Sequence, residues 1–130
     1  MSELPGPPRA LILDDEKSIV RLCARVIEGL GARADTAGTL SEAAARIRAD
    51  RYDLFVCDMR LPDGAGLDLE KLYRERNPGG RIIVMTGSLT PGHPALVAQE
   101  IVVLSKPFEL AYFRAVVAGA LDAGTREDEE

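Results

Sequence analysis

Several side chains that could carry out phosphoryl chemistry follow directly after apolar runs of the chain. Each run is short and rich in branched residues: Asp14 and Asp15 follow Leu11–Leu13, Asp58 follows Leu54–Cys57, Thr86 follows Ile82–Met85, and Lys106 follows Val102–Ser105. Apolar runs without alternation are typical of strands that are covered on both faces, and helical patterns between them make the sheet parallel. The polar residues therefore mark strand ends.

These strand-end side chains are predicted to form one site. In open parallel sheets the functional crevice lies beyond the carboxyl ends of the strands. Three carboxylates at short range repel each other, so a cation belongs there, and Mg²⁺ suits oxygen ligands and bridges to phosphate. With Mg²⁺, Lys106 and Thr86 neutralising the transferring phosphoryl oxygens, Asp58 can attack phosphorus. The predicted product is an acyl phosphate on Asp58.

The elements that must position this site alternate along the chain. The predicted strands are Arg9–Leu13, Ala32–Thr36, Asp53–Cys57, Arg81–Met85 and Ile101–Leu104. The predicted helices are Glu16–Leu30, Ser41–Asp50 with Thr39 as an equally good cap, one through Leu67–Leu72 that ends at Asn77–Gly80, a short one within Ala95–Gln99, and Phe108–Leu121. This order predicts a doubly wound α/β sandwich.

Length and charge restrict the class of protein. A chain of 130 residues fits one domain, which we expect at residues 9–122, between a disordered lead-in at residues 1–8 and an acidic flexible tail at residues 123–130. A net charge of -5 argues against direct nucleic-acid binding. The absence of a long apolar run argues against a membrane span and favours a cytoplasmic protein. Cys23 and Cys57 have no metal-site spacing and are interpreted as reduced core residues.

Four motifs carry a resemblance to a known family. In chain order they are Leu13–Glu16, Asp58–Gly66, Met85–Gly87 and Ser105–Phe108. In type, order and spacing they resemble those of the response-regulator receiver domain of two-component signalling, and the resemblance covers about Arg9 to Leu121. It implies a flavodoxin-like (CheY-like) five-stranded parallel sheet of order 2-1-3-4-5 with helices on both faces.

The resemblance also implies the roles of individual residues. Asp58 would be the phosphoacceptor, Asp15 a direct Mg²⁺ ligand, and Asp14 a ligand mainly through water. The backbone carbonyl of Arg60 would complete the protein ligands. Lys106 would contact the phosphoryl group.

Further positions follow from the same resemblance. The Lys106–Pro107 peptide bond would be cis, and Thr86 would close on the phosphoryl group. Arg60 and Ser88 occupy positions that influence the lifetime of the acyl phosphate, although ordinary rim residues are an equal interpretation.

The chain departs from the family pattern at one switch position. Receivers usually carry an aromatic residue three positions before the lysine, and here that residue is Val103. A valine has no ring to reorient, so the usual relay between threonine and aromatic residue is not expected. The segments Gly87–Pro94 and Leu61–Gly66 border the site and are the candidates for a mobile element.

The predicted function is a switch in a phosphorelay, not a turnover enzyme. A histidine kinase or histidine phosphotransfer protein would phosphorylate Asp58, and the modified surface would bind or release a protein target. The chain is interpreted as a single-domain regulator, with a piece of a longer protein as the alternative.

The competing functions are a receiver-like binding module that needs no phosphorylation and a phosphatase similar to the haloacid dehalogenase family. That family places an Asp-x-Asp motif after its first strand, whereas this chain has Asp58-Met59-Arg60 after its third. A nucleotide- or flavin-binding module is not expected, because no glycine-rich phosphate loop follows the first strand of this chain.

Overall fold

Five segments of the chain form a single parallel sheet, and four of them are rich in branched apolar residues. The computed structural model of the chain describes residues 6–87 and 101–129, with side chains as far as residue 122. The strand order is β2-β1-β3-β4-β5, which confirms the predicted topology. The strands are β1 (Arg9–Leu13), β2 (Arg33–Ala37), β3 (Leu54–Asp58), β4 (Arg81–Thr86) and β5 (Ile101–Ser105).

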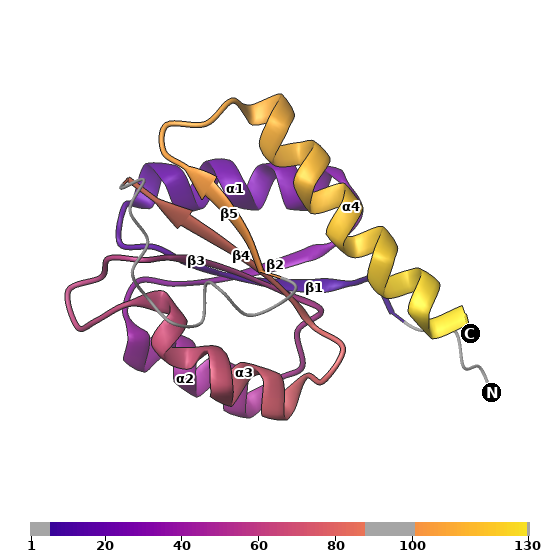
Figure 1. Cartoon of the computed structure of the whole chain (residues 1–130), viewed down its shortest axis with the longest axis horizontal. Coiled ribbons are helices and arrows are strands. Elements are labelled where there is room, and N and C mark those ends of the chain that lie inside the picture. Colours follow the sequence, from indigo (N-terminus) through magenta and orange to yellow (C-terminus); the bar gives the residue numbers. More distant parts are fainter. Residues whose placement is uncertain (1–5, 88–100, 130) are drawn as a thin grey trace.

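Helices cover both faces of this sheet (Figure 1). On one face lie α1 (Lys17–Gly29) and α4 (Leu110–Glu129), and on the other lie α2 (Leu40–Ala49) and α3 (Glu70–Arg76). A short 3₁₀ segment, η1 (Gly66–Leu69), leads into α3. Each face has its own apolar cluster, one containing Ile27 and Phe113, the other Ile47 and Tyr73. Within the described residues, no helix is both long and apolar enough to span a bilayer.

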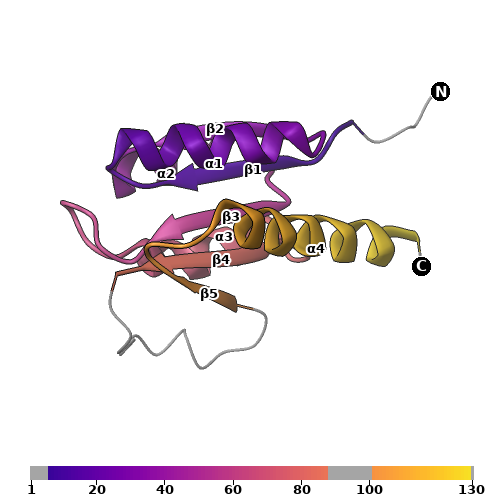
Figure 2. The same cartoon turned by 90° about the horizontal axis from the view of Figure 1, so that it is seen from above.

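The three central strands are almost fully buried, as their continuous apolar runs predict. Every residue of β3 is buried, and so is each residue of β1 and β4 after the first. The edge strand β2 is more exposed, in keeping with its mixed sequence. Viewed from above, the strands lie side by side in the order of the sheet (Figure 2). Because all are parallel, their carboxyl ends lie along one edge.

The element boundaries differ from the predictions in a few places. Strands β2 and β3 both begin and end one residue later than predicted. The cap of α2 is Thr39, whose Oγ1 accepts a hydrogen bond of 3.2 Å from the backbone N–H of Glu42. The last helix begins at Leu110 and continues through Glu129, so the segment predicted as a flexible tail is helical that far. The short helix predicted within residues 95–99 lies outside the described residues.

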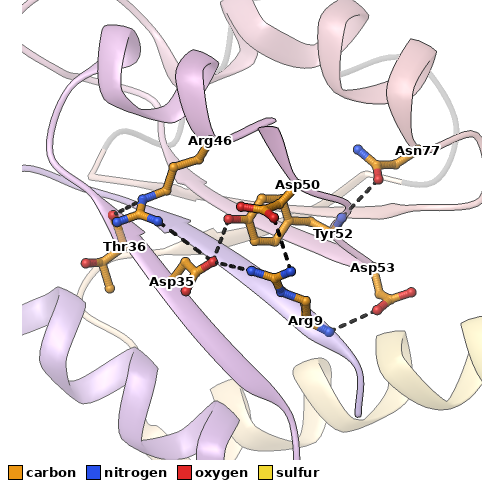
Figure 3. Close-up of polar contacts among 8 residues, drawn as sticks. All are labelled: Arg9, Asp35, Thr36, Arg46, Asp50, Tyr52, Asp53 and Asn77. Atoms are coloured by element: carbon orange, nitrogen blue, oxygen red, sulfur yellow. Dashed lines mark hydrogen bonds and ion pairs between the residues drawn. The ribbon is translucent and has the colours of Figure 1, made fainter. Parts of the chain in front are cut away.

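A polar network joins β1, β2 and α2 to the segment between α2 and β3 (Figure 3). The guanidinium of Arg9 lies 3.0 Å from Asp35 on β2 and 3.4 Å from Asp50, which follows α2. The hydroxyl of Tyr52, just before β3, donates a 2.6 Å hydrogen bond to the same Asp35 carboxylate. Arg46 on α2 donates to the carbonyl of Thr36 at 3.0 Å and approaches Asp35 at 3.9 Å. These contacts tie the edge strand β2 to β1, to α2 and to the segment before β3.

Candidate functional site

Three aspartates converge at the carboxyl edge of the sheet. Asp14, Asp15 and Asp58 each offer a carboxylate oxygen, and these oxygens lie within 4.8 Å of one another. The convergence follows from the register, since Leu13 on β1 pairs with Cys57 on β3 and the aspartates come next along the chain. Asp14 and Asp58 are buried and Asp15 is exposed. The sequence-based prediction of a single acidic cluster therefore agrees with the geometry.

Lys106 reaches this cluster from the end of β5. Its Nζ donates to Asp14 Oδ2 at 2.9 Å, to Glu16 Oε1 at 3.1 Å and to Asp58 Oδ2 at 3.2 Å. Its backbone N–H donates a 2.7 Å hydrogen bond to the carbonyl of Thr86. The Lys106–Pro107 peptide bond is cis. The ammonium thus lies between the carboxylates of β1 and β3.

The charges in this site influence each other strongly. Burial raises the pKa of Asp58, the charge of Asp14 raises it further, and Lys106 offsets part of the rise. Burial lowers the pKa of Lys106, but its hydrogen bonds to Asp14 and Glu16 outweigh burial, so that the net pKa is raised. Lys106 is therefore held as a cation among carboxylates that repel one another.

The donor set fits a hard divalent cation. The three aspartates supply only oxygen atoms, which are the ligands that Mg²⁺ prefers. Together with Glu16 they make four carboxylates, and three of these, on Asp14, Glu16 and Asp58, pair with Lys106. Among the described residues the carboxylates of the site therefore outnumber its ammonium group. An added divalent cation would relieve the repulsion that burial and Asp14 impose on Asp58.

Arg60 and Thr86 also lie at this edge. The backbone N–H of Arg60 is 3.4 Å from Asp58 Oδ1, so the chain turns tightly after the predicted phosphoacceptor. Thr86 ends β4 in register with Ser105, the residue before Lys106, and it is buried. Ser88 lies outside the described residues.

One contact of Lys106 could not be foreseen from strand ends alone. Glu16 had no predicted role, yet its carboxylate is one of the three that Lys106 contacts. The available signal was its position directly after Asp14-Asp15. Its pairing with a residue 90 positions away depends on the fold.

The loop after Asp58 is anchored to α2. The carboxylate of Asp63 accepts hydrogen bonds from the backbone N–H groups of Leu40, at 3.0 Å, and Ser41, at 3.4 Å. Two backbone hydrogen bonds between Leu61 and Gly64 close the loop on itself. The mobility predicted for residues 61–66 remains a prediction, and that for residues 87–94 falls mostly outside the described residues.

Val103, the atypical switch position, lies on β5 opposite Val84. Its side chain is substantially exposed, as is that of Val102. Val103 is thus a branched residue without a ring at the position predicted to depart from the usual pattern.

Comparisons with known proteins agree with this geometry. The family model for the response regulator receiver domain matches residues 10–118. Response regulator protein PilR of Pseudomonas aeruginosa is 36% identical over 124 residues, which cover 94% of this chain and 28% of PilR. Photosynthetic apparatus regulatory protein RegA of Rhodovulum sulfidophilum is 36% identical over 85 residues, covering 65% of this chain and 46% of RegA. The chain thus spans less than half the length of either relative.

Solved structures show the same fold. The crystal structure of a receiver domain protein from Methanospirillum hungatei superposes with a TM-score of 0.85 at 26% identity, covering 94% of this chain and 99% of that one. The beryllofluoride-activated NtrC4 receiver domain superposes with a TM-score of 0.78 at 30% identity, covering 89% and 98%. A family match over most of the chain, the sheet order and the strand-end cluster lead to one conclusion: the chain belongs to the response regulator receiver domain family.

Proposed function

We propose that this chain is a phosphorylation switch whose phosphoacceptor is Asp58. The observation that carries the proposal is the position of Lys106 Nζ, 3.2 Å from Asp58 and 2.9 Å from Asp14 within the three-carboxylate cluster. A carboxylate beside an ammonium and a cation site has what it needs to react with a phosphoryl group.

In the proposed reaction, a carboxylate oxygen of Asp58 forms a bond to phosphorus while the bond between phosphorus and the donor breaks. With a phosphohistidine donor, the P–N bond breaks, its electron pair stays on the imidazole nitrogen, and a proton from solvent neutralises it. The product is an acyl phosphate. Water later attacks this phosphorus, the bond between phosphorus and the Asp58 oxygen breaks, and Asp58 returns as a carboxylate while phosphate and a proton are released. In this proposal the chain acts as a phosphoacceptor and not as a turnover enzyme.

Asp14, Asp15, Asp58 and the backbone carbonyl of Arg60 are the proposed holders of Mg²⁺. When bound, this ion supplies positive charge that offsets the phosphoryl oxygens. The three aspartates support the assignment by their proximity and oxygen chemistry.

Other residues complete the proposed chemistry. Lys106 contacts a phosphoryl oxygen, and the Thr86 hydroxyl donates to another. Arg60 and Ser88 adjust how readily water reaches the phosphoryl group. With Val103 in place of a ring, the change at Thr86 is read out without an aromatic side chain that swings inward.

The proposed donor is a histidine kinase or a histidine phosphotransfer protein, as is general for receiver domains. We place this exchange in the cytoplasm, with a protein as the downstream target and without direct contact to nucleic acid or membrane. The longer relatives leave open whether the target belongs to the same polypeptide.

The proposal is tested by measuring the intact mass of the wild type and of Asp58→Asn after incubation with acetyl phosphate and Mg²⁺. We expect the wild type to gain one phosphoryl group, whereas Asp58→Asn and a wild-type sample treated with EDTA stay unmodified. Asn at this buried position keeps the shape of Asp but lacks the nucleophilic carboxylate.

Other outcomes support other functions. If no histidine kinase or acetyl phosphate modifies the wild type, the binding module that needs no phosphorylation becomes the better description. Repeated turnover of a small phosphate ester would support the phosphatase alternative. Modification of both proteins would place the phosphoryl group on a residue other than Asp58.

A further inference from the structure

Glu16 stands at the start of α1 but does not cap it. As the residue before the helix it has extended backbone angles, and its side chain makes no capping hydrogen bond. An Asp in this position usually accepts a hydrogen bond from the first turn of the helix, and any acidic side chain there is favoured by the helix dipole. Here the carboxylate is instead 3.1 Å from Lys106 Nζ. The side chain is thus directed to the functional site rather than to its own helix.

The local turn fixes Glu16 beside the acidic cluster. Asp14 accepts a 3.0 Å hydrogen bond from the backbone N–H of Glu16 through Oδ1, and it accepts from Lys106 through Oδ2. The Asp14 carboxylate therefore contacts both residues of the ion pair between Glu16 and Lys106. The pair is a consequence of the turn after β1.

The three carboxylates that pair with Lys106 differ in exposure and in whether they belong to the proposed metal cluster. Asp14 and Asp58 belong to the proposed metal cluster, and their side chains are 0% and 9% exposed. Glu16 is outside that cluster, and its side chain is 58% exposed. When a divalent cation occupies the cluster it competes with Lys106 for Asp14 and Asp58, but it does not compete for Glu16.

We propose that Glu16 is a positioning residue that keeps Lys106 paired while Asp14 and Asp58 bind the divalent cation. This inference rests on the proposed function, which supplies the cation. Without Glu16, the partners of the Lys106 ammonium among the described residues are all proposed metal-binding carboxylates, and the ammonium then opposes the cation more strongly. Glu16 thus favours cation binding indirectly, through Lys106.

The test is the Mg²⁺ affinity of four proteins: wild type, Glu16→Gln, Lys106→Met and the double variant. Each is titrated with MgCl₂ at constant ionic strength and followed by ¹H–¹⁵N NMR shifts of residues around the site. We expect Glu16→Gln to raise the Kd for Mg²⁺ roughly two- to fivefold, the size expected of a largely exposed ion pair. In the Lys106→Met background, we expect the same substitution to change the Kd much less.

A matched control separates this effect from the general loss of negative charge. Glu28→Gln removes the same charge at the other end of α1, where Glu28 is exposed, and we expect the wild-type Kd. An unchanged Kd in Glu16→Gln overturns the inference. So does an equal effect in both Lys106 backgrounds, because Glu16 would then act on the cation directly.

Failure of the proposed function has a different signature. If the wild type shows no shifts with Mg²⁺ and no phosphorylation by acetyl phosphate, the function proposed above is wrong, and the role of Glu16 is wrong with it. If the wild type binds Mg²⁺ and only the Glu16 comparison fails, the function stands and the positioning role is rejected.

Discussion

The carboxylates at the functional edge are arranged for chemistry rather than for stability. Asp58 is buried beside Asp14, and this position raises the pKa of Asp58 by desolvation and then by repulsion. Lys106 offsets this rise in pKa only in part, because its ammonium is paired with three carboxylates at once. Sites that keep such repulsion commonly lower the stability of the free protein.

A stability measurement follows from this repulsion. In the absence of divalent cations, we expect Asp58→Asn to raise the free energy of unfolding by roughly 1 kcal/mol, because a neutral amide removes the repulsion with Asp14. The measurement is urea unfolding followed by circular dichroism in EDTA. Adding Mg²⁺ should reduce the difference in unfolding free energy between the two proteins, because cation binding stabilises the wild type more than Asp58→Asn. A lower stability of Asp58→Asn in EDTA would contradict the explanation, and Glu28→Gln serves as the control for a charge change elsewhere.

At the scale of elements, the end of β3 and the start of η1 are packed too closely for any side chain but hydrogen at Gly66. A Cβ atom added there would overlap the carbonyl oxygen of Asp58 and would lie 2.9 Å from Cys57 Sγ. Strand β3 thus ends directly against the following segment. Asp63, in the same loop, holds the amino end of α2.

Two glycine substitutions test this close approach. We expect Gly66→Ala to lower the free energy of unfolding by about 1–3 kcal/mol, as overpacking of a buried site does. The matched control is Gly119→Ala, since a Cβ at Gly119 meets nothing within 4 Å and alanine favours the α4 helix by about 1 kcal/mol. Both are measured by chemical denaturation. Equal changes in the free energy of unfolding of the two variants would show that the close contact between Gly66 and β3 does not affect stability.

At the scale of the whole molecule, the two ends of the sheet differ in their electrostatics. The carboxyl edge gathers like charges, whereas the network near the amino end of β1 pairs opposite ones. There, burial alone would raise the pKa of Asp35, but hydrogen bonds from Tyr52 and Arg9 outweigh it and lower the pKa below its ordinary value. Burial and the neighbouring Asp35 raise the pKa of Tyr52 to about 12, so its hydroxyl stays protonated and donates.

The network around Asp35 makes the free energy of unfolding depend on pH. A carboxylate whose pKa is lowered by folding contributes stability above its unfolded pKa, near 4, and loses it as the pH falls through the folded value. We therefore expect Asp35→Asn to be less stable than the wild type by about 1–2 kcal/mol at pH 6, with the difference shrinking below about pH 4. Tyr52→Phe should reproduce part of this dependence. Parallel stability curves for wild type and Asp35→Asn between pH 7 and pH 3 would refute the assignment.

The sequence predicted the strands and the acidic cluster because both depend on local pattern. Apolar runs of one strand length followed by Asp14, Asp58 or Lys106 are informative without any knowledge of distant contacts. The order of the sheet came from the family resemblance, and the structure confirms it.

Other features depended on contacts that one-dimensional patterns do not contain. The pair of Glu16 and Lys106 and the pair of Arg9 and Asp50 join residues far apart in the chain. The end of the last helix was predicted too early because Gly124 and the acidic residues after it are typical of a tail, whereas the backbone continues as helix through Glu129. Thr39 and Ser41 were equally good caps by type, and the structure shows that the cap is Thr39, whose side chain accepts from the backbone N–H of Glu42.

The two cysteines offer a way to observe motion of the native protein. Both are free thiols and buried: Cys57 lies next to Asp58, and Cys23 lies on the buried side of α1, in the apolar cluster on the opposite face of the sheet. Burial raises the pKa of each thiol, for Cys23 to about 12, so a thiol reagent reacts only when the surrounding structure opens. The ratio of the two labelling rates therefore reports how often the end of β3 opens independently of the other face, without introducing any foreign probe into the chain.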